Sequence, residues 1–168
     1  MTQPAIQVRK AVAGDLQIIN DIYNDYILHT TITFDEQLWS LQQREQWFCQ
    51  YQHGPHSVLV ALSEGLVVGF AYTSPFRYKS AYQRSAEVTV YTHKVAPKGS
   101  GTQLYKALMQ AVEGHFHRLY AMISLPNDKS LSLHAKCGFQ QVGLLDDVGY
   151  KFDRYHSVAI LEKQLSTP

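Results

Sequence analysis

This chain of 168 residues has few cysteines, almost no excess of positive over negative charge, and no long apolar run. The two cysteines, Cys49 and Cys137, have no CxxC spacing, which argues against a disulfide framework and a thiolate metal site. The 15 basic and 14 acidic residues leave a formal charge of +1, which gives no dense basic surface for nucleic acid. The longest apolar runs, such as Val58–Leu62, are too short to cross a bilayer, and residues 1–10 lack the apolar core of a signal peptide. We therefore expect a cytoplasmic protein with a small-molecule ligand and with no nucleic-acid or membrane partner.

Histidine is more frequent, with eight residues, but its spacing does not favour a metal site. Only His115 and His117 lie close together, and two ligands of this spacing make a poor metal set. We expect no metal.

The chain has no internal repeat, charge run or linker rich in proline and glycine, so residues 1–168 are expected to form a single domain. Hydrophobic periodicity and turn signals predict the element order β-α-α-β-β-β-α-β-α-β-β. The predicted helices are Asp15–Leu28, Leu41–Tyr51, one that begins in the loop 96–101, and Asn127–Lys136. The predicted strands are 6–10, Val58–Leu62, Leu66–Tyr72, Ala86–His93, Leu119–Ser124, Phe139–Leu145 and Tyr155–Leu161.

Local signals mark several of these elements. Ser40 and Gln43 form a capping box ahead of the second helix, and Ser63-Glu64-Gly65 is a turn between two strands. Gly138 is a natural left-handed helix cap, with Phe139 folding back onto the helix. The apolar stripe of the third helix, which includes Tyr105, is expected to be core.

The segment Ala96-Pro97-Lys98-Gly99-Ser100-Gly101 connects a predicted strand to a predicted helix. Small side chains let the backbone approach a ligand, and the free N–H groups at the start of a helix favour an anion. This pattern indicates a pyrophosphate-binding loop, whereas an isolated segment of this kind would more often be an ordinary turn before a helix.

A second pattern follows in the order that a known superfamily shows. After strand, glycine loop, helix and strand comes Asn127-x-x-Ser130-x-x-x-His134-x-x-x-Gly138-Phe139, which resembles the GNAT superfamily of acetyl-CoA-dependent N-acetyltransferases. Further segments resemble its phosphinothricin and methionine sulfoximine N-acetyltransferase subgroup: Ile22-Tyr23-Asn24, Thr31–Phe34, Pro75-Phe76-Arg77, Ala81-Tyr82, Glu87-x-x-Val90-Tyr91 and Val148–Tyr155. The resemblance implies an α/β (α+β) fold with four helices and a mixed, mostly antiparallel sheet of six to seven strands.

The resemblance also implies where acetyl-CoA binds. Backbone groups on one strand would pair with the pantetheine arm, and N–H groups of the glycine loop would hold the pyrophosphate. The expected cofactor-binding residues are Val90, Tyr91, Thr92, Pro97, Lys98, Gly99, Ser100, Gly101, Thr102 and Asn127. The chain departs from the family at Ala96-Pro97, where a Gln or Arg is usual and the loop is one residue shorter, and proline offers no N–H donor. Asn127 has a second expected role as a helix N-cap.

Two residues are expected to act in catalysis. Glu87 matches the glutamate of the subgroup and would take a proton from the amine, directly or through water. The alternative is a solvent-facing or ion-paired strand carboxylate. A backbone N–H from the Val90 region would stabilise the developing oxyanion. His134 stands where many GNAT enzymes carry a tyrosine that protonates the leaving thiolate; the alternative is a helix histidine packed near Phe139.

The acceptor is expected to be the primary amine of a small amino-acid-like molecule, with Arg77 pairing with its carboxylate. The expected acceptor-binding residues are Thr33, Phe34, Arg77, Ser80, Ala81, Tyr82 and Tyr155. Two alternatives stay open at this point: another amine (a polyamine, an aminoglycoside or a protein N-terminus), or a non-catalytic CoA-binding regulatory module. The resemblance further implies a homodimer.

Overall fold

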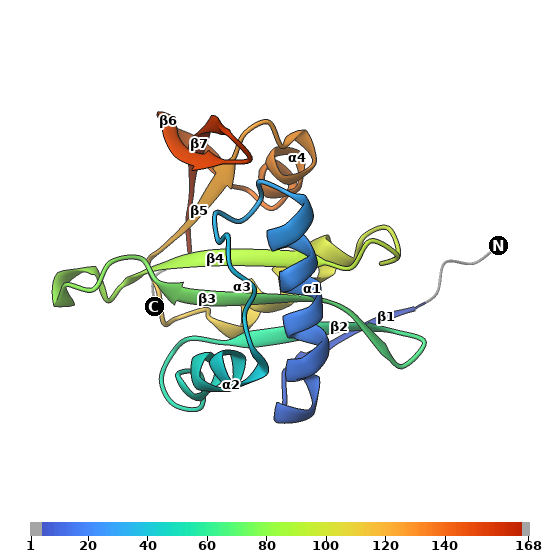
Figure 1. The fold of residues 1–168 in the computed structure, drawn as a ribbon. Coiled ribbons are helices and arrows are strands. Elements are labelled where there is room, and N and C mark those ends of the chain that lie inside the picture. The colour runs from blue at the N-terminus through green and yellow to red at the C-terminus, as the bar shows by residue number, and fades with distance from the viewer. Residues whose placement is uncertain (1–4, 166–168) are drawn as a thin grey trace.

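A seven-stranded sheet of order β1-β2-β3-β4-β5-β7-β6 organises the computed structural model, which describes residues 5–165 (Figure 1). Neighbouring strands are antiparallel except β4 and β5, which are parallel. The strands are β1 Ile6–Lys10, β2 Val58–Ser63, β3 Leu66–Pro75, β4 Ser85–Thr92, β5 Arg118–Ser124, β6 Gln140–Lys151 and β7 Arg154–Gln164. The helices are α1 Leu16–His29, α2 Leu41–Cys49, α3 Ser100–Ala111 and α4 Asp128–Lys136. The predicted order and the mixed α+β architecture are confirmed.

Two helical layers cover the sheet. The apolar face of α1, which includes Ile19, Ile22 and Ile27, is buried against Val60 and Phe70 on one side of the strands. On the opposite side, the apolar face of α3 packs into the larger core cluster, and Figure 1 shows α1 and α3 on opposite faces of the central strands. The central strands, including β4, are thus fixed from both faces.

Local capping signals set two helix ends. Ser40 Oγ accepts a hydrogen bond from Gln43 N at 3.2 Å while Gln43 Oε1 accepts from Ser40 N at 2.8 Å, which is the predicted capping box of α2. At the end of α4, Gly138 has φ +84°, and the N–H groups of Gly138 and Phe139 donate to Ala135 and His134. This Schellman-type end brings Phe139 back onto the helix, as predicted.

The β6–β7 hairpin is longer than the sequence predicted. The expected strand ended at Leu145, but β6 continues to Lys151 beyond an irregular stretch between Leu145 and Gly149, in which Asp147 has φ +50°. Residues 145–149 mix apolar and acidic residues without alternation, which hid this strand from a periodicity argument. A two-residue turn closes the hairpin, with Phe152 at φ +52° and Asp153 at φ +58°.

Strands β4 and β5 separate soon after they begin. Their parallel pairing covers only Ser85–Glu87 against Arg118–Tyr120, although β4 runs on to Thr92 and β5 to Ser124. Strand β3, in contrast, pairs with β4 from Ala86 to Thr92. The second half of β4 therefore has a sheet neighbour on one side and an opening on the other.

Candidate active site

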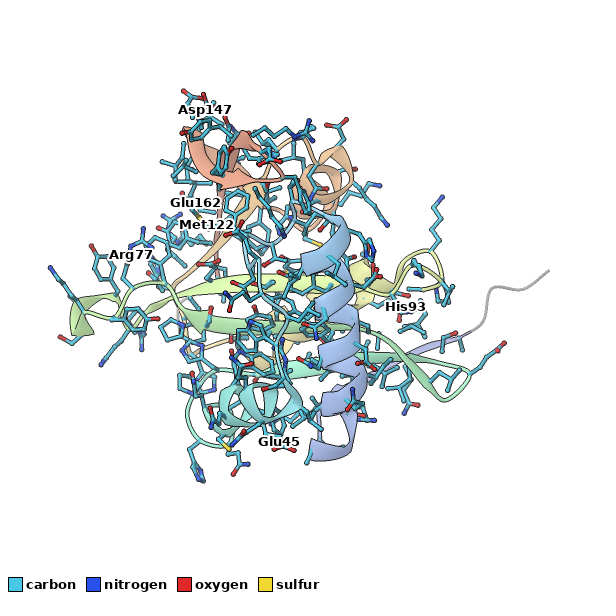
Figure 2. The ribbon with its side chains drawn as sticks, viewed as in Figure 1. Glu45, Arg77, His93, Met122, Asp147 and Glu162 are labelled. Atoms are coloured by element: carbon cyan, nitrogen blue, oxygen red, sulfur yellow. The ribbon has the colours of Figure 1, made fainter. Side chains whose placement is uncertain are left out.

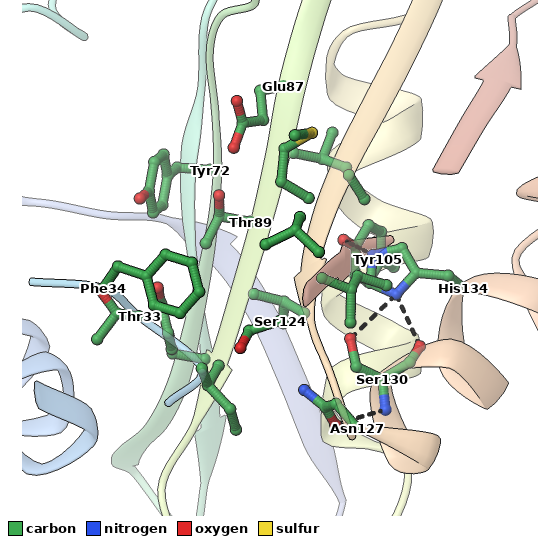
Figure 3. Close-up of a pocket in the computed structure, with 18 residues that line it drawn as sticks. Thr33, Phe34, Tyr72, Glu87, Thr89, Tyr105, Ser124, Asn127, Ser130 and His134 are labelled. Carbon is green, nitrogen blue, oxygen red and sulfur yellow. Dashed lines mark hydrogen bonds between the residues drawn. The ribbon is translucent and has the colours of Figure 1, made fainter. Parts of the chain in front are cut away.

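The opening between β4 and β5 contains a cavity of about 240 Å³. Figure 3 shows Glu87 and Thr89 on β4 facing this space, with Thr33 and Phe34 on one side and His134, Ser130 and Asn127 on the other. The lining combines carboxylate, hydroxyl, imidazole and apolar groups, so the cavity can hold a small polar molecule beside a titratable group.

Glu87 lies at the last position where β4 pairs with β5, opposite Tyr120. Burial raises the pKa of its carboxyl group, while the positive charge of Arg77 acts in the opposite direction. A carboxylate with a raised pKa beside a cavity suits the removal of a proton from an amine near neutral pH.

His134 is 3% exposed, and both of its ring nitrogens have partners. Nδ1 lies 2.7 Å from the carbonyl oxygen of Ser130, so Nδ1 carries a hydrogen, because two acceptors would repel at this distance. Nε2 lies 2.5 Å from the hydroxyl oxygen of Tyr105 on α3. Burial lowers the pKa of the imidazole, so its neutral form is favoured and Nε2 accepts the Tyr105 hydrogen. Sequence reasoning missed Tyr105, whose position on the apolar stripe of α3 marked it as core.

A second cavity of about 870 Å³ adjoins the first, and Ile32, Val90, Asn127 and Ser130 line both. Its lining contains nearly all the residues predicted to bind the cofactor: Val90, Thr92, Pro97, Lys98, Gly99, Ser100, Gly101, Thr102 and Asn127. Tyr91, the remaining one, lines the first cavity. The structure thus assembles the predicted cofactor residues along one continuous cleft.

The glycine loop offers free hydrogen-bond donors to this cleft. Within residues 5–165, the N–H groups of Lys98, Gly99, Gly101 and Thr102 donate to no backbone carbonyl, which is expected where a helix begins. Ser100 differs, because its N–H and hydroxyl both donate to the Pro97 carbonyl, at 3.2 Å and 2.7 Å. The Ser100 N–H is thus already paired within the loop, and the contact of Ser100 with a pyrophosphate stays a prediction.

Positive side chains surround the same cleft. Lys94, Lys98, Lys129 and Lys136 line it, together with a single acidic residue, Asp25. Asn127 Oδ1 accepts a hydrogen bond from Ser130 N at 3.1 Å, so Asn127 is the N-cap of α4 as well as a cleft residue. Free N–H donors, a helix N-terminus and lysines match a phosphorylated coenzyme.

Ser124, near the end of β5, is a cavity residue that the sequence did not indicate. Its Oγ is buried and, within residues 5–165, has no hydrogen-bond partner. An unpaired buried hydroxyl is unfavourable, and a polar atom of a bound molecule would satisfy it. No spacing rule marks a single serine at the end of an apolar strand, so sequence reasoning had no signal for it.

The predicted acceptor residues divide into two groups. Thr33 and Phe34 line the first cavity, whereas Arg77, Ser80, Ala81, Tyr82 and Tyr155 line neither cavity. Arg77 is exposed, with its guanidinium 4.5 Å from the centre of the Phe76 ring, and Figure 2 shows it beyond the start of β4, at the end opposite His93. Tyr155 is 65% exposed on the β6–β7 hairpin.

Two features are absent from residues 5–165, the part of the chain that the structure describes. No group of three or more His, Cys, Asp or Glu side chains is placed to hold a metal ion. No helix has the length and hydropathy that a membrane span requires.

Similarity to known proteins agrees with this geometry. The profile described as "Acetyltransferase (GNAT) domain" matches residues 8–159. A phosphinothricin N-acetyltransferase of Streptomyces coelicolor is 40% identical over 95% of this chain and 96% of its own length. An L-methionine sulfoximine/L-methionine sulfone acetyltransferase of Pseudomonas aeruginosa is 31% identical over 94% of each chain.

Solved structures show the same relationship. A GNAT superfamily phosphinothricin acetyltransferase from Sinorhizobium meliloti, solved in complex with acetyl-CoA, has a TM-score of 0.91 at 31% identity, covering 96% of this chain and 89% of its own. A ribosomal-protein-alanine N-acetyltransferase from Brucella melitensis has a TM-score of 0.91 at 35% identity, covering 95% and 99%.

The chain therefore belongs to the GNAT acetyltransferase family, as the order of its motifs predicted. It is an acetyl-CoA-dependent N-acetyltransferase with acetyl-CoA as co-substrate. The alternative of a non-catalytic CoA-binding module is not supported.

Proposed function

We propose that this protein transfers the acetyl group of acetyl-CoA to the primary amine of a small amino-acid-like acceptor of the phosphinothricin or methionine sulfoximine type. The observation that carries the proposal is the position of Glu87, which lies half-buried where β4 and β5 separate, at one end of a cleft whose other end is the glycine loop. The names of the two curated relatives support the acceptor class.

The cofactor end uses backbone donors and lysines. We assign the diphosphate to the free N–H groups of the glycine loop, with the charge of Lys98 nearby. Val90, Tyr91 and Thr92 belong to the part of β4 that lacks a neighbour on the β5 side, so their backbone groups can pair with the pantetheine arm. Pro97 contributes its carbonyl to Ser100 and no N–H to the ligand.

The chemistry takes place beside Glu87. The bound thioester supplies an electrophilic carbonyl, and the amine must lose a proton before its lone pair can attack. Glu87 takes that proton, directly or through a water molecule, in a direct transfer within a ternary complex. A backbone N–H of the Val90 region donates to the carbonyl oxygen as its negative charge develops.

His134 and Tyr105 are assigned to the leaving thiolate as a pair. Nε2 of neutral His134 has no hydrogen to give, so the sequence-based role of His134 as a direct donor requires a modification. The Tyr105 hydroxyl gives its proton to the thiolate, and a proton from solvent restores the hydroxyl. Nε2 of His134 accepts a hydrogen bond from this hydroxyl before and after the relay and so holds it in place. The Nδ1–H bond to the Ser130 carbonyl keeps the ring oriented during this relay.

The acceptor end comprises Thr33 and Phe34 together with the exposed segment before β4. Arg77 is placed close enough to Glu87 to affect its pKa, and this supports the proposal that its guanidinium meets the acceptor carboxylate. Ser80, Ala81, Tyr82 and Tyr155 stay predictions for this end. A panel of amines tests the acceptor class through CoA thiol release. We expect the highest kcat/KM for phosphinothricin or methionine sulfoximine, and no turnover of either would contradict the proposal.

A protein N-terminus is the second candidate acceptor, because the similar Brucella melitensis structure carries the name of a ribosomal-protein-alanine N-acetyltransferase. A peptide that begins with alanine therefore belongs in the same panel, with spermidine as a cationic comparison. A kcat/KM for the peptide that exceeds the amino-acid values would favour this candidate.

A homodimer is the proposed assembly. Strand β6 is an end strand of the sheet, and its side chains Val142, Leu144, Val148 and Tyr150 are each about half exposed. An apolar sheet edge in water favours association with a second chain. The cytoplasmic location expected from the sequence stays a prediction.

A further inference from the structure

The first cavity, beside Glu87, is the proposed site of the acceptor amine and is called the acceptor cavity below. One wall of it contacts the β6–β7 hairpin, which is far from that wall in the sequence. Thr33 and Phe34 line the cavity from the segment between α1 and α2. The ammonium group of Lys151, at the end of β6, donates a hydrogen bond to the Thr33 carbonyl oxygen at 2.8 Å. This bond joins residues 118 positions apart and connects the β6–β7 hairpin to the cavity wall.

Lys151 is unusual for a lysine because only 2% of it is exposed. Burial lowers the pKa of its amine, while the carboxylates of Asp35 and Glu36 act in the opposite direction. A buried amine requires a hydrogen-bond acceptor, and the Thr33 carbonyl provides one. Loss of this bond would leave both the amine and the carbonyl without a partner, so the contact fixes the position of Thr33.

Gly149 supports the neighbouring residue by having no side chain. A Cβ atom built on Gly149 would lie 2.2 Å from Cε2 and 2.4 Å from Cζ of Phe34. The ring of Phe34 therefore occupies the space over the Gly149 backbone, beside the buried ring of His156. Any larger residue at position 149 would displace this ring.

The opposite side of the same segment is also fixed. The Tyr23 hydroxyl on α1 lies 3.0 Å from Thr33 Oγ1 and donates to Asp35 Oδ2 at 2.7 Å. Trp39 Nε1 donates to the same carboxylate oxygen at 2.8 Å. The segment that contains Thr33 and Phe34 is thus held by contacts with α1 on one side and with the β6–β7 hairpin on the other.

We infer that Lys151 and Gly149 are positioning residues, through which the β6–β7 hairpin sets the place of Thr33 and Phe34 and hence the affinity for the acceptor amine. The inference rests on the proposed function, because it assumes that the amine binds at this wall. Neither residue touches the glycine loop or the second cavity. Their effect therefore belongs to the acceptor and not to acetyl-CoA.

A double-mutant cycle tests the Gly149 contact. Gly149→Ala should raise the KM for the acceptor amine by about tenfold or more, because misplacement by about 1 Å can cost about 100-fold. The KM for acetyl-CoA should stay within about twofold. In a Phe34→Ala background, where the ring is absent, Gly149→Ala should add less than about twofold. Equal effects in both backgrounds, or an unchanged amine KM, would overturn the inference for Gly149.

Lys151→Met tests the second contact, with Arg154→Met as a matched control. Arg154 is the strand partner of Lys151 across the same turn but is exposed. Only Lys151→Met should raise the amine KM and accelerate amide hydrogen exchange of residues 31–36, each by about tenfold or more. Exchange and KM equal to those of the control would overturn the inference for Lys151.

The exchange measurement separates this inference from the proposed function. Wild-type protein that turns over no amine, with faster exchange in Lys151→Met, would contradict the proposed function and support the positioning contact. Normal turnover of amino-acid acceptors, with unchanged exchange and unchanged KM in Lys151→Met, would support the proposed function and contradict the positioning contact.

Discussion

Burial gives the Glu87 carboxyl group a chemistry that an exposed strand glutamate lacks. Removal of water raises its pKa, and the charge of Arg77 opposes this effect. Because its pKa is raised, the ionised carboxyl group is a stronger base than a glutamate in water and suits the removal of a proton from the amine.

Glu87→Gln should lower kcat/KM for the acceptor by about 100-fold or more, the range in which general bases contribute. In the wild type, activity should fall as the pH decreases through the raised pKa of Glu87, since a protonated carboxyl group cannot accept a proton. The variant should lose this acidic limb. A pH–rate profile with the same limb in both proteins would remove Glu87 from the role of base.

His134 makes a residue-scale contribution to stability as well. Its pKa is lowered in the folded protein, so below the unfolded value of about 6.5 the unfolded chain binds more protons than the folded one. Stability should then decrease as the pH falls below about 6.5 and should be insensitive to this group at higher pH.

His134→Gln should therefore weaken the pH dependence of the unfolding free energy between about pH 7 and 5, measured by urea titration. Glutamine can still donate to one neighbour and accept from the other, but it does not titrate. The pKa of His56 is also lowered by burial, so some dependence should remain. An unchanged slope would show that His134 is not held neutral.

At the scale of elements, the start of α3 brings together the glycine loop, a helix N-terminus and the second cavity. Gly101 lines the cofactor cavity, and a Cβ there would be 3.4 Å from Leu133 Cδ2, an ordinary contact. Packing against the protein itself thus does not require a glycine here, and we propose that close approach of the coenzyme does.

Gly101→Trp should therefore reduce acetyl-CoA affinity by about 100-fold or more while the protein stays folded, because the indole would fill the cleft. Isothermal titration with acetyl-CoA measures the change. Gly14→Trp provides the control, since nothing lies within 4 Å of a Cβ at Gly14. Wild-type affinity in Gly101→Trp would mean that the loop is only a turn.

The elements that sequence reasoning located are those with local signals. The β2–β3 turn has Glu64 at φ +52° and Gly65 at φ +81°, which the Ser63-Glu64-Gly65 segment indicated, and the Ser40 capping box marked α2. The order of the motifs indicated Glu87 and the glycine loop as candidate site residues. The contacts that were missed are non-local: Tyr105 with His134 and Lys151 with Thr33 join elements whose spacing carries no pattern.

At the scale of the whole molecule, we propose that the end strand β6 carries the contact with a second copy. Val148→Glu would introduce a charge among the exposed apolar side chains of this strand. Sedimentation should show wild-type protein at twice the chain mass of 19.1 kDa and the variant as monomer. Leu66→Glu, at an exposed position on β3, should remain dimeric. A monomeric wild type would contradict the homodimer.

The separation of β4 from β5 gives the coenzyme a structural part to play in addition to its chemical one. The sheet is continuous through β1 to β4 and through β5, β7 and β6. In the described part of the chain, strand pairing between these two halves is limited to Ser85–Glu87 against Arg118–Tyr120. We propose that the pantetheine arm pairs with the backbone of Val90–Thr92 and so takes the place of a neighbouring strand between the two halves. Binding of acetyl-CoA should thus hold the two halves of the sheet more firmly together and make the protein more rigid before the acetyl group is transferred.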